Sequence, residues 1–289
     1  MALLGLLYDL RRLHGWNLQL WHGNHGWHGD SADVAAALAQ WCNQNKLPLK
    51  VSHAAAEDVK TEAMARDWRY KTLSTLALQL NCDVVTAHTA TDRAETVLLN
   101  LARGCDLQGL SSLSAERTLS KNLPQGPKLR RPLLHLRRQE TLQICQKLNL
   151  PIWIDPTNAQ LHLARNRIRH QVLPVLDQLH PGSDRRIAEL SERVSQIRDT
   201  QDQLCELALQ NLCDLSGLKR EGIFQLQAAT CRVLLMSWID DCGAPKPNTQ
   251  SLDRLINLLK TPGSSGVLDL GKNWILTWNK TYINISKST

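Results

Sequence analysis

The sequence predicts an α/β protein: a parallel sheet with helices on both faces, followed by a smaller C-terminal helical and β domain. Helical and extended patterns alternate through the first half of the chain, the pattern beyond it is mostly helical, and the last stretch alternates as short strands. Such strand and helix alternation is typical of a parallel sheet between two layers of helices. A chain of 289 residues can fill one large core and one smaller core. We therefore expect domains at 1–180 and 181–289.

The first half opens with leucines at helical spacing and continues with short apolar runs that indicate strands. Ser31 is the expected N-cap of one helix, Thr61 opens another with Glu62 in its first turn, and Gly104 ends a third. The predicted helices are 2–13, 31–45, 61–80 and 91–104, and the predicted strands are 17–21, 49–53 and 83–87.

The second half begins after a polar stretch at 114–128, which contains Pro124, Gly126 and Pro127 and predicts an exposed, mobile loop. Helical patterns follow at 136–148, 165–179, 183–212, 225–241 and 250–259. Residues 266–286 alternate as short strands, with turns at 271–272 and 279–280. This tail is expected to form a separate small module.

Composition favours a soluble, cytoplasmic protein. Hydrophobic residues make up 43% of the chain and charged residues 21%, as in ordinary globular proteins. No apolar run approaches the roughly 20 residues that cross a bilayer, and the start MALLGLLYDL has no preceding basic segment of the kind a signal peptide carries. The net charge of +7 favours a polyanionic partner such as nucleic acid, although the same excess can merely aid solubility.

No metal site is expected. The eight cysteines are scattered, and no two form the Cys-x-x-Cys pair that holds zinc or an iron–sulfur cluster. His22, His25 and His28 are spaced by three on an expected loop, which matches no zinc pattern. We interpret the cysteines as reduced, mostly buried thiols.

The most informative segment runs from 86 to 95 and reads TAHTATDRAE, where a predicted strand ends and a helix begins. Ligands of open parallel sheets bind at the carboxyl ends of strands, and His88, Asp92 and Glu95 all fall at that edge. Two carboxylates beside an imidazole can bind a cationic substrate, hold magnesium or move protons. Alternatively, Asp92 caps the helix while Glu95 pairs with Arg93 or another surface cation.

Two further segments carry clustered arginines. Residues 62–70 read EAMARDWRY and place Arg66 and Arg69 close together on one helix, where guanidinium groups suit a phosphate or where they form a solvated, ion-paired face. Residues 153–169 place Asp155 and Asn158 around a turn, followed by three arginines that we expect to spread over a broad basic surface suited to an RNA backbone: Arg165, Arg167 and Arg169. A well-solvated helix start is the competing interpretation.

In this order the segments resemble tRNA(Ile)-lysidine synthetase, a family within the N-type ATP pyrophosphatases. The resemblance covers most of the first 175 residues and depends on an ordered set of motifs: NHGWHGDS at 24–31, EAMARDWRY at 62–70, TAHTATDRAETVLLNLARG at 86–104, DLQGL at 106–110, RRPLL at 130–134, and WIDPTN with RNRIR near Asp155 and Arg167. It implies an adenine nucleotide alpha-hydrolase-like sheet and a tRNA-binding tail.

The resemblance implies an enzyme that uses ATP, with Mg²⁺, to adenylate the C2 oxygen of the wobble cytidine in the CAU anticodon of tRNA(Ile). The amine of free lysine then attacks C2, AMP leaves and lysidine results. It implies a lysine and adenylate site at His88, Asp92 and Glu95, and phosphate stabilisation by Arg66. The remaining residues that it implies contact ATP, substrate or tRNA are His25, Arg69, Arg130, Arg131, Asp155, Asn158, Arg165, Arg167 and Arg169.

The sequence departs from the family at its start. The family's Ser-Gly-Gly-x-Asp-Ser loop, whose N–H groups hold pyrophosphate, is absent, and we expect it and a central strand immediately upstream of Met1. Asn24 stands where an aspartate is usual, and His28 where an arginine is frequent. A catalytically inactive RNA-binding fragment is the alternative function, whereas a thiolase that uses an iron–sulfur cluster would need paired cysteines.

Overall fold

The computed structural model describes residues 1–27, 29, 31–120, 123, 125–153 and 156–287. The chain divides into two compact units, Met1–Ser195 and Gln196–Thr289. The expected boundary at 180/181 falls at the start of a long helix, α9 (Ser183–Leu212), which runs through the observed division. Among the described residues, no helix is both long and apolar enough to cross a membrane.

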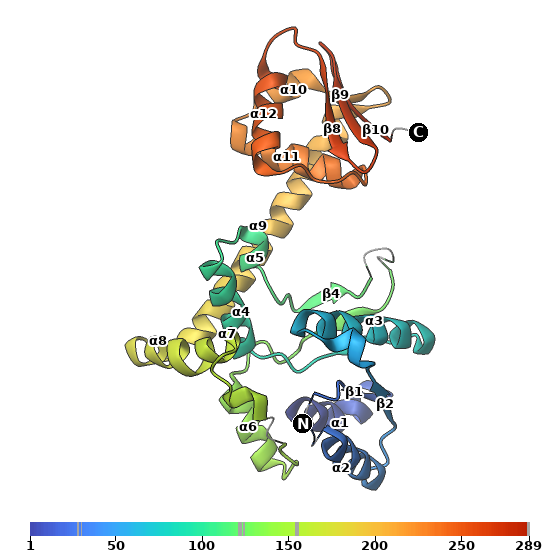
Figure 1. Cartoon of the computed structure of the whole chain (residues 1–289), viewed down its shortest axis with the longest axis vertical. Helices are drawn as coiled ribbons and strands as arrows, with labels where there is room; N and C mark the ends of the chain where they lie inside the picture. The colour runs from blue at the N-terminus through green and yellow to red at the C-terminus, as the bar shows by residue number, and fades with distance from the viewer. Residues whose placement is uncertain (28, 30, 121–122, 124, 154–155, 288–289) are drawn as a thin grey trace. The chain divides into compact units, whose positions relative to one another are not determined.

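Unit 1 contains the predicted alternation of strands and helices and several elements that follow it (Figure 1). Its strands are β1 (Leu20–Asn24), β2 (Leu49–His53), β3 (Val84–Val85), β4 (Glu116–Thr118) and β5 (Lys128–Arg130). Its helical segments before α9 are α1 (Ala2–His14), α2 (Ser31–Gln44), η1 (Ala56–Val59), α3 (Glu62–Leu80), α4 (Ala90–Ala102), α5 (Leu107–Leu110), α6 (Arg138–Lys147), η2 (Pro156–Ala159), α7 (Ala164–Arg167), η3 (Ile168–Val172) and α8 (Leu173–Leu179).

The described strands of unit 1 pair in two sheets. β1 and β2 are parallel, with Leu20 opposite Leu49, and β3 pairs in parallel with β5, whose other edge takes β4 in antiparallel orientation. Parallel pairing with helical crossovers confirms the predicted α/β class. The strand expected at 17–21 begins instead at Leu20, because the hydrogen-bonded register with β2 decides its ends.

The loop predicted at 114–128 is wrong in part, since β4 lies within it and β5 begins at its last residue. Cross-strand ion pairs stabilise this hairpin: Glu116 contacts Lys128 and Arg130, with nitrogen–oxygen distances of 2.5 Å for both pairs. A search for apolar alternation misses such a strand because its side chains are charged.

Helix α4 begins one residue earlier than predicted because Thr89 is its N-cap. The Thr89 hydroxyl accepts a hydrogen bond from the Asp92 N–H, and the Asp92 side chain accepts one from the Thr89 N–H, which completes a capping box. Helix α3 begins in the same way, with the Thr61 hydroxyl accepting from the Met64 N–H. In each helix the capping hydroxyl and the N–H that it accepts from lie three residues apart, so the local sequence is enough to form the cap.

The helix predicted at 165–179 is interrupted. It consists of α7, a π-helical turn (η3) and α8, with a proline, Pro174, at the start of α8. Proline has no N–H to donate to the carbonyl four residues earlier, so the regular hydrogen-bond ladder cannot continue through this position. A π-helical turn accommodates the break.

Unit 2 combines helices with an antiparallel sheet of order β6–β7–β10–β9–β8. Its core is apolar and includes Leu218, Leu235, Leu255, Leu276 and Ile283. The predicted tail strands and turns are confirmed. The elements after α9 are β6 (Cys213–Asp214), β7 (Gly217–Lys219), α10 (Arg220–Phe224), α11 (Ala228–Asp241), α12 (Thr249–Lys260), β8 (Gly266–Gly271), β9 (Trp274–Trp278) and β10 (Tyr282–Lys287).

Candidate active site

The candidate active site lies where β3 ends and α4 begins. Asp92 serves the cap that one interpretation predicted: its Oδ2 accepts hydrogen bonds from the Thr89 N–H at 2.9 Å and the Thr89 hydroxyl at 2.7 Å. Its other oxygen, Oδ1, faces the guanidinium groups of Arg138 at 3.9 Å and Arg169 at 3.8 Å. Burial alone would raise the pKa of Asp92, but the Thr89 hydrogen bonds and the nearby arginines hold it below its usual value.

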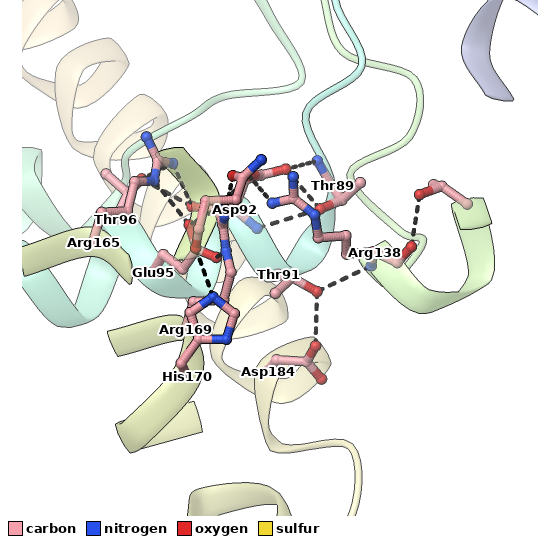
Figure 2. Close-up of polar contacts among 12 residues, drawn as sticks. Thr89, Thr91, Asp92, Glu95, Thr96, Arg138, Arg165, Arg169, His170 and Asp184 are labelled. Carbon is pink, nitrogen blue, oxygen red and sulfur yellow. Dashed lines mark hydrogen bonds and ion pairs between the residues drawn. The ribbon is translucent and has the colours of Figure 1, made fainter. Parts of the chain in front are cut away.

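Glu95 is completely buried and is bound by two arginines (Figure 2). Arg165 Nε donates to Oε2 at 2.8 Å, while Arg169 donates from Nε to Oε1 at 2.6 Å and from its terminal nitrogen to Oε2 at 2.9 Å. Arg93, the partner that one interpretation gave Glu95, instead pairs with Glu192 at 2.7 Å. Both oxygens of Glu95 are therefore occupied by protein cations.

The expectation that three arginines spread over a broad surface is wrong for two of them. Arg165 and Arg169 are four residues apart, so they share one helix face and turn inward to Glu95. Arg169 also donates to Asn158 Oδ1 at 2.9 Å. Arg167 lies between them and is exposed, and among the described residues its side chain hydrogen-bonds only to Gln171, at 3.4 Å.

Three helix N-termini meet beside this site. The Thr91 hydroxyl, in the first turn of α4, donates to Asp184 Oδ2 at 2.9 Å and accepts from the Arg138 N–H at 3.1 Å. Asp184 lies in the first turn of α9 and also pairs with Arg137 at 2.8 Å. These contacts fix the first turn of α4, and hence Asp92, against α6 and α9.

His88 lies in the segment between β3 and the Thr89 cap. Its Nδ1 is 2.9 Å from the Thr86 hydroxyl, so its Nε2 is the nitrogen left for a ligand. Burial and the nearby Arg131 lower the pKa of His88 to about 4, although Asp92 opposes the shift. The imidazole is therefore neutral at pH 7 and can accept a hydrogen bond.

His25 and Arg69 are joined across β1 and α3. Arg69 lies 3.4 Å from His25 Nε2, and His25 Nδ1 lies 3.0 Å from the Gly23 carbonyl oxygen. Burial and Arg69 lower the pKa of His25. His25 also contacts the ring of Trp68 edge-on, with centroids 5.2 Å apart.

The other predicted residues fall in different surroundings. Arg130 is half exposed and its charge is balanced by Asp83, at 2.7 Å, and by Glu116. Arg131, its neighbour, is buried and donates to the Ser114 carbonyl oxygen at 2.7 Å. Asp155 lies outside the described residues.

Two residues that the sequence analysis did not single out, Tyr70 and Arg117, lie beside the predicted Arg66. Arg117 lies over the Tyr70 ring with its guanidinium carbon 4.9 Å from the centroid, and Arg66 lies 5.8 Å from the same centroid. Tyr70 directly follows Arg69 in the segment already identified, so it could have been included. Arg117 lies in the polar stretch at 114–128, where no apolar alternation indicates a strand.

No group of three or more histidine, cysteine, aspartate or glutamate side chains within the described part of the chain is arranged to hold a metal ion.

Comparison with known proteins matches residues 1–176 to the PP-loop domain family. The chain is 50% identical over 278 residues to the tRNA(Ile)-lysidine synthase of Parasynechococcus marenigrum, which covers 96% of the chain and 82% of that relative. It is 41% identical over 293 residues to a tRNA(Ile)-lysidine synthase of Prochlorococcus marinus, covering 99% of the chain and 86% of the relative.

Among solved structures, the U34-tRNA thiolase NcsA from Methanococcus maripaludis superposes with a TM-score of 0.54 at 22% identity. The match covers 67% of this chain and 68% of the thiolase. At this identity the likeness concerns the fold alone.

Proposed function

The chain belongs to the tRNA(Ile)-lysidine synthase family, and from this premise we propose how its residues carry out the reaction. The protein is a ligase that forms lysidine on tRNA(Ile) with ATP. The observation that carries this conclusion is the 50% identity across 96% of the chain, because a match of that extent includes both units.

The reaction has two steps. The C2 oxygen of the wobble cytidine attacks the α-phosphorus of ATP, and pyrophosphate leaves. The uncharged amine of free lysine then attacks C2, the bond from C2 to the adenylated oxygen breaks, and AMP leaves with that oxygen. Adenylation is needed because an unactivated carbonyl oxygen is a poor leaving group, whereas AMP is a good one.

Asp92 is the residue we assign to the ammonium group of lysine. Its Oδ1 has cationic groups at 3.8 Å and 3.9 Å, beyond hydrogen-bond length, so it can accept a donor from a ligand. The lowered pKa keeps the carboxylate ionised through the neutral range. Neutral His88, four residues before Asp92, can accept a hydrogen bond from the attacking amine through its Nε2.

We assign Glu95 a different role from the one the resemblance implies. Its oxygens are both bound by Arg165 and Arg169, so we assign it as a positioning residue that holds these guanidinium groups beside Asp92. Arg66 is exposed and would stabilise phosphate charge. Exposed Arg69 and Arg167, with unit 2, are proposed tRNA contacts.

Mg²⁺ is proposed to arrive with ATP and to neutralise its phosphate charge.

The test is lysidine formation on a tRNA(Ile) transcript with ATP and labelled lysine. Both the 289-residue chain and a form that includes the coding sequence upstream of Met1 are assayed, so that the choice of start codon does not decide the result. We expect Asp92→Asn to lower kcat/KM for lysine by at least about 100-fold, since one charge-assisted contact to the ammonium group of lysine is lost.

The matched control is Asp253→Asn, which removes a carboxylate paired with Arg232 in unit 2. Asparagine at position 92 keeps an oxygen for the Thr89 cap, so the variant should fold. Wild-type kcat/KM for lysine in Asp92→Asn would contradict the assignment of Asp92. Absence of lysidine from both forms, although they fold and bind tRNA, would favour the RNA-binding alternative.

A further inference from the structure

Three arginines from separate parts of unit 1 surround the side chain of Tyr70. Arg66 precedes it by one turn on α3, Arg117 comes from β4, and Arg131 directly follows β5. Figure 1 shows α3 and β4 side by side, and the 4.9 Å approach of Arg117 to the Tyr70 ring joins them. We call Arg66, Tyr70, Arg117 and Arg131 the Tyr70 cluster.

The guanidinium groups of the Tyr70 cluster lack carboxylate partners. Several other described arginines of unit 1 form ion pairs, for example Arg93 with Glu192 and Arg130 with Asp83. Among the described residues, no carboxylate oxygen lies within 4.0 Å of the side-chain nitrogens of Arg66, Arg117 or Arg131. Three positive charges therefore gather around one phenol without a protein anion.

Arg131 is the strongest sign that this arrangement serves a ligand. Its side chain is 3% exposed, and its Nη1 donates to the Ser114 carbonyl oxygen at 2.7 Å. Its Nε–H is buried and has no partner within the described structure. An unpaired donor on a buried cation is unfavourable unless an anion or acceptor joins it.

The pKa of Tyr70 shows the electrostatic effect of these three positive charges. Burial opposes ionisation of its hydroxyl, but Arg131 beside that hydroxyl, helped by Arg66 and Arg117, lowers the pKa of Tyr70 overall. The Tyr70 hydroxyl is therefore the group whose ionisation these arginines favour. While it is protonated the phenol carries no charge, so it does not neutralise the guanidinium groups.

We propose that the Tyr70 cluster is a phosphate-binding subsite, with Arg117 and Arg131 as ligand contacts and Tyr70 as a positioning residue that spaces the guanidinium groups. A guanidinium offers a planar fork of N–H donors that matches phosphate oxygens. Given the proposed function, on which the source of the ligand depends, the phosphate belongs either to the tRNA backbone or to the polyphosphate of ATP.

Arg117→Gln is the informative variant, because Arg117 is partly exposed and its side chain makes one hydrogen bond among the described residues, to the Thr118 carbonyl oxygen. Arg12→Gln, on the exposed face of α1, removes the same charge away from the cluster. Arg117→Lys keeps the charge without the fork. Thermal unfolding of each variant checks that it folds.

Binding is measured directly, by titration with tRNA(Ile) transcript and, separately, with ATP and with inorganic pyrophosphate. We expect Arg117→Gln to raise the Kd about 10-fold, either for tRNA or for ATP and pyrophosphate. Arg117→Lys should raise the same Kd less, and Arg12→Gln should leave it unchanged. Weaker tRNA binding with a salt slope reduced by about 1 identifies a backbone phosphate. Weaker ATP and pyrophosphate binding identifies the polyphosphate.

Equal binding of all these ligands by Arg117→Gln and Arg12→Gln would overturn the proposal. Because binding is read without turnover, this outcome is distinct from a failure of the proposed function, which would appear as wild-type protein that binds tRNA and makes no lysidine.

Discussion

Replacing Glu95 by glutamine separates a structural from a substrate-binding role for this carboxylate. The side chain is fully buried and accepts three hydrogen bonds from Arg165 and Arg169, with donor–acceptor distances of 2.6 to 2.9 Å. Glutamine has nearly the same volume but places an amide N–H₂ against a guanidinium. Arg169, which is 13% exposed, would then keep only the more distant Asp92 as an anionic partner.

Removing one partner of a buried ion pair costs about 3–5 kcal/mol. Arg165 is 35% exposed, so water replaces part of the interaction that it loses. We therefore expect the free energy of unfolding to fall by the lower end of this range, about 3 kcal/mol. For a unit of this size, 1 kcal/mol corresponds to roughly 2–4 °C in Tm, so the transition of unit 1 should fall by about 6–12 °C.

Differential scanning calorimetry measures this shift, with Glu57→Gln, an exposed glutamate of η1, as the matched control. A Tm of Glu95→Gln within about 2 °C of wild type would refute the structural reasoning. If that stable variant also made no lysidine, Glu95 would be reassigned to substrate contact.

Three other predictions concern acid stability, a buried arginine and a helix cap. The pKa of His88 falls from 6.5 to about 4 on folding, so the unfolded chain binds more protons between these values and stability decreases as pH falls through them, by about 3 kcal/mol in all. Urea titrations of His88→Gln should show a flatter pH dependence from 6.5 to 4 than those of a His162→Gln control, and an unchanged slope would disprove the assignment. Arg220 is fully buried and donates to several carbonyl oxygens around the C-terminal end of α12, including those of Leu259 at 2.8 Å and Thr261 at 2.6 Å. Arg220→Met should destabilise unit 2 by at least about 3 kcal/mol in urea titrations, because these acceptors lose their donor, whereas a loss below about 1 kcal/mol would show that water replaces it. Thr89→Ala should cost about 1 kcal/mol by removing the hydroxyl of the α4 cap, as measured by thermal unfolding, and no loss would mean that Asp92 alone maintains the cap.

The sequence by itself determined the features that depend on neighbours in the chain. The alternation of strands and helices, the Thr61 cap and the tail strands follow from hydrogen bonds and side-chain periodicity within a few residues. The position of His88, Asp92 and Glu95 at one strand end follows from the same local pattern, and so does the cap role of Asp92.

Only the tertiary structure decided which charges meet. Glu95 binds arginines that lie 70 and 74 residues further along the chain, and Arg117 reaches Tyr70 from a different strand. Nothing local distinguishes a buried carboxylate paired with two guanidinium groups from one that awaits a substrate. The difference depends on burial and on long-range packing, because an ion pair is stable inside a protein only where the fold brings both partners together and excludes water.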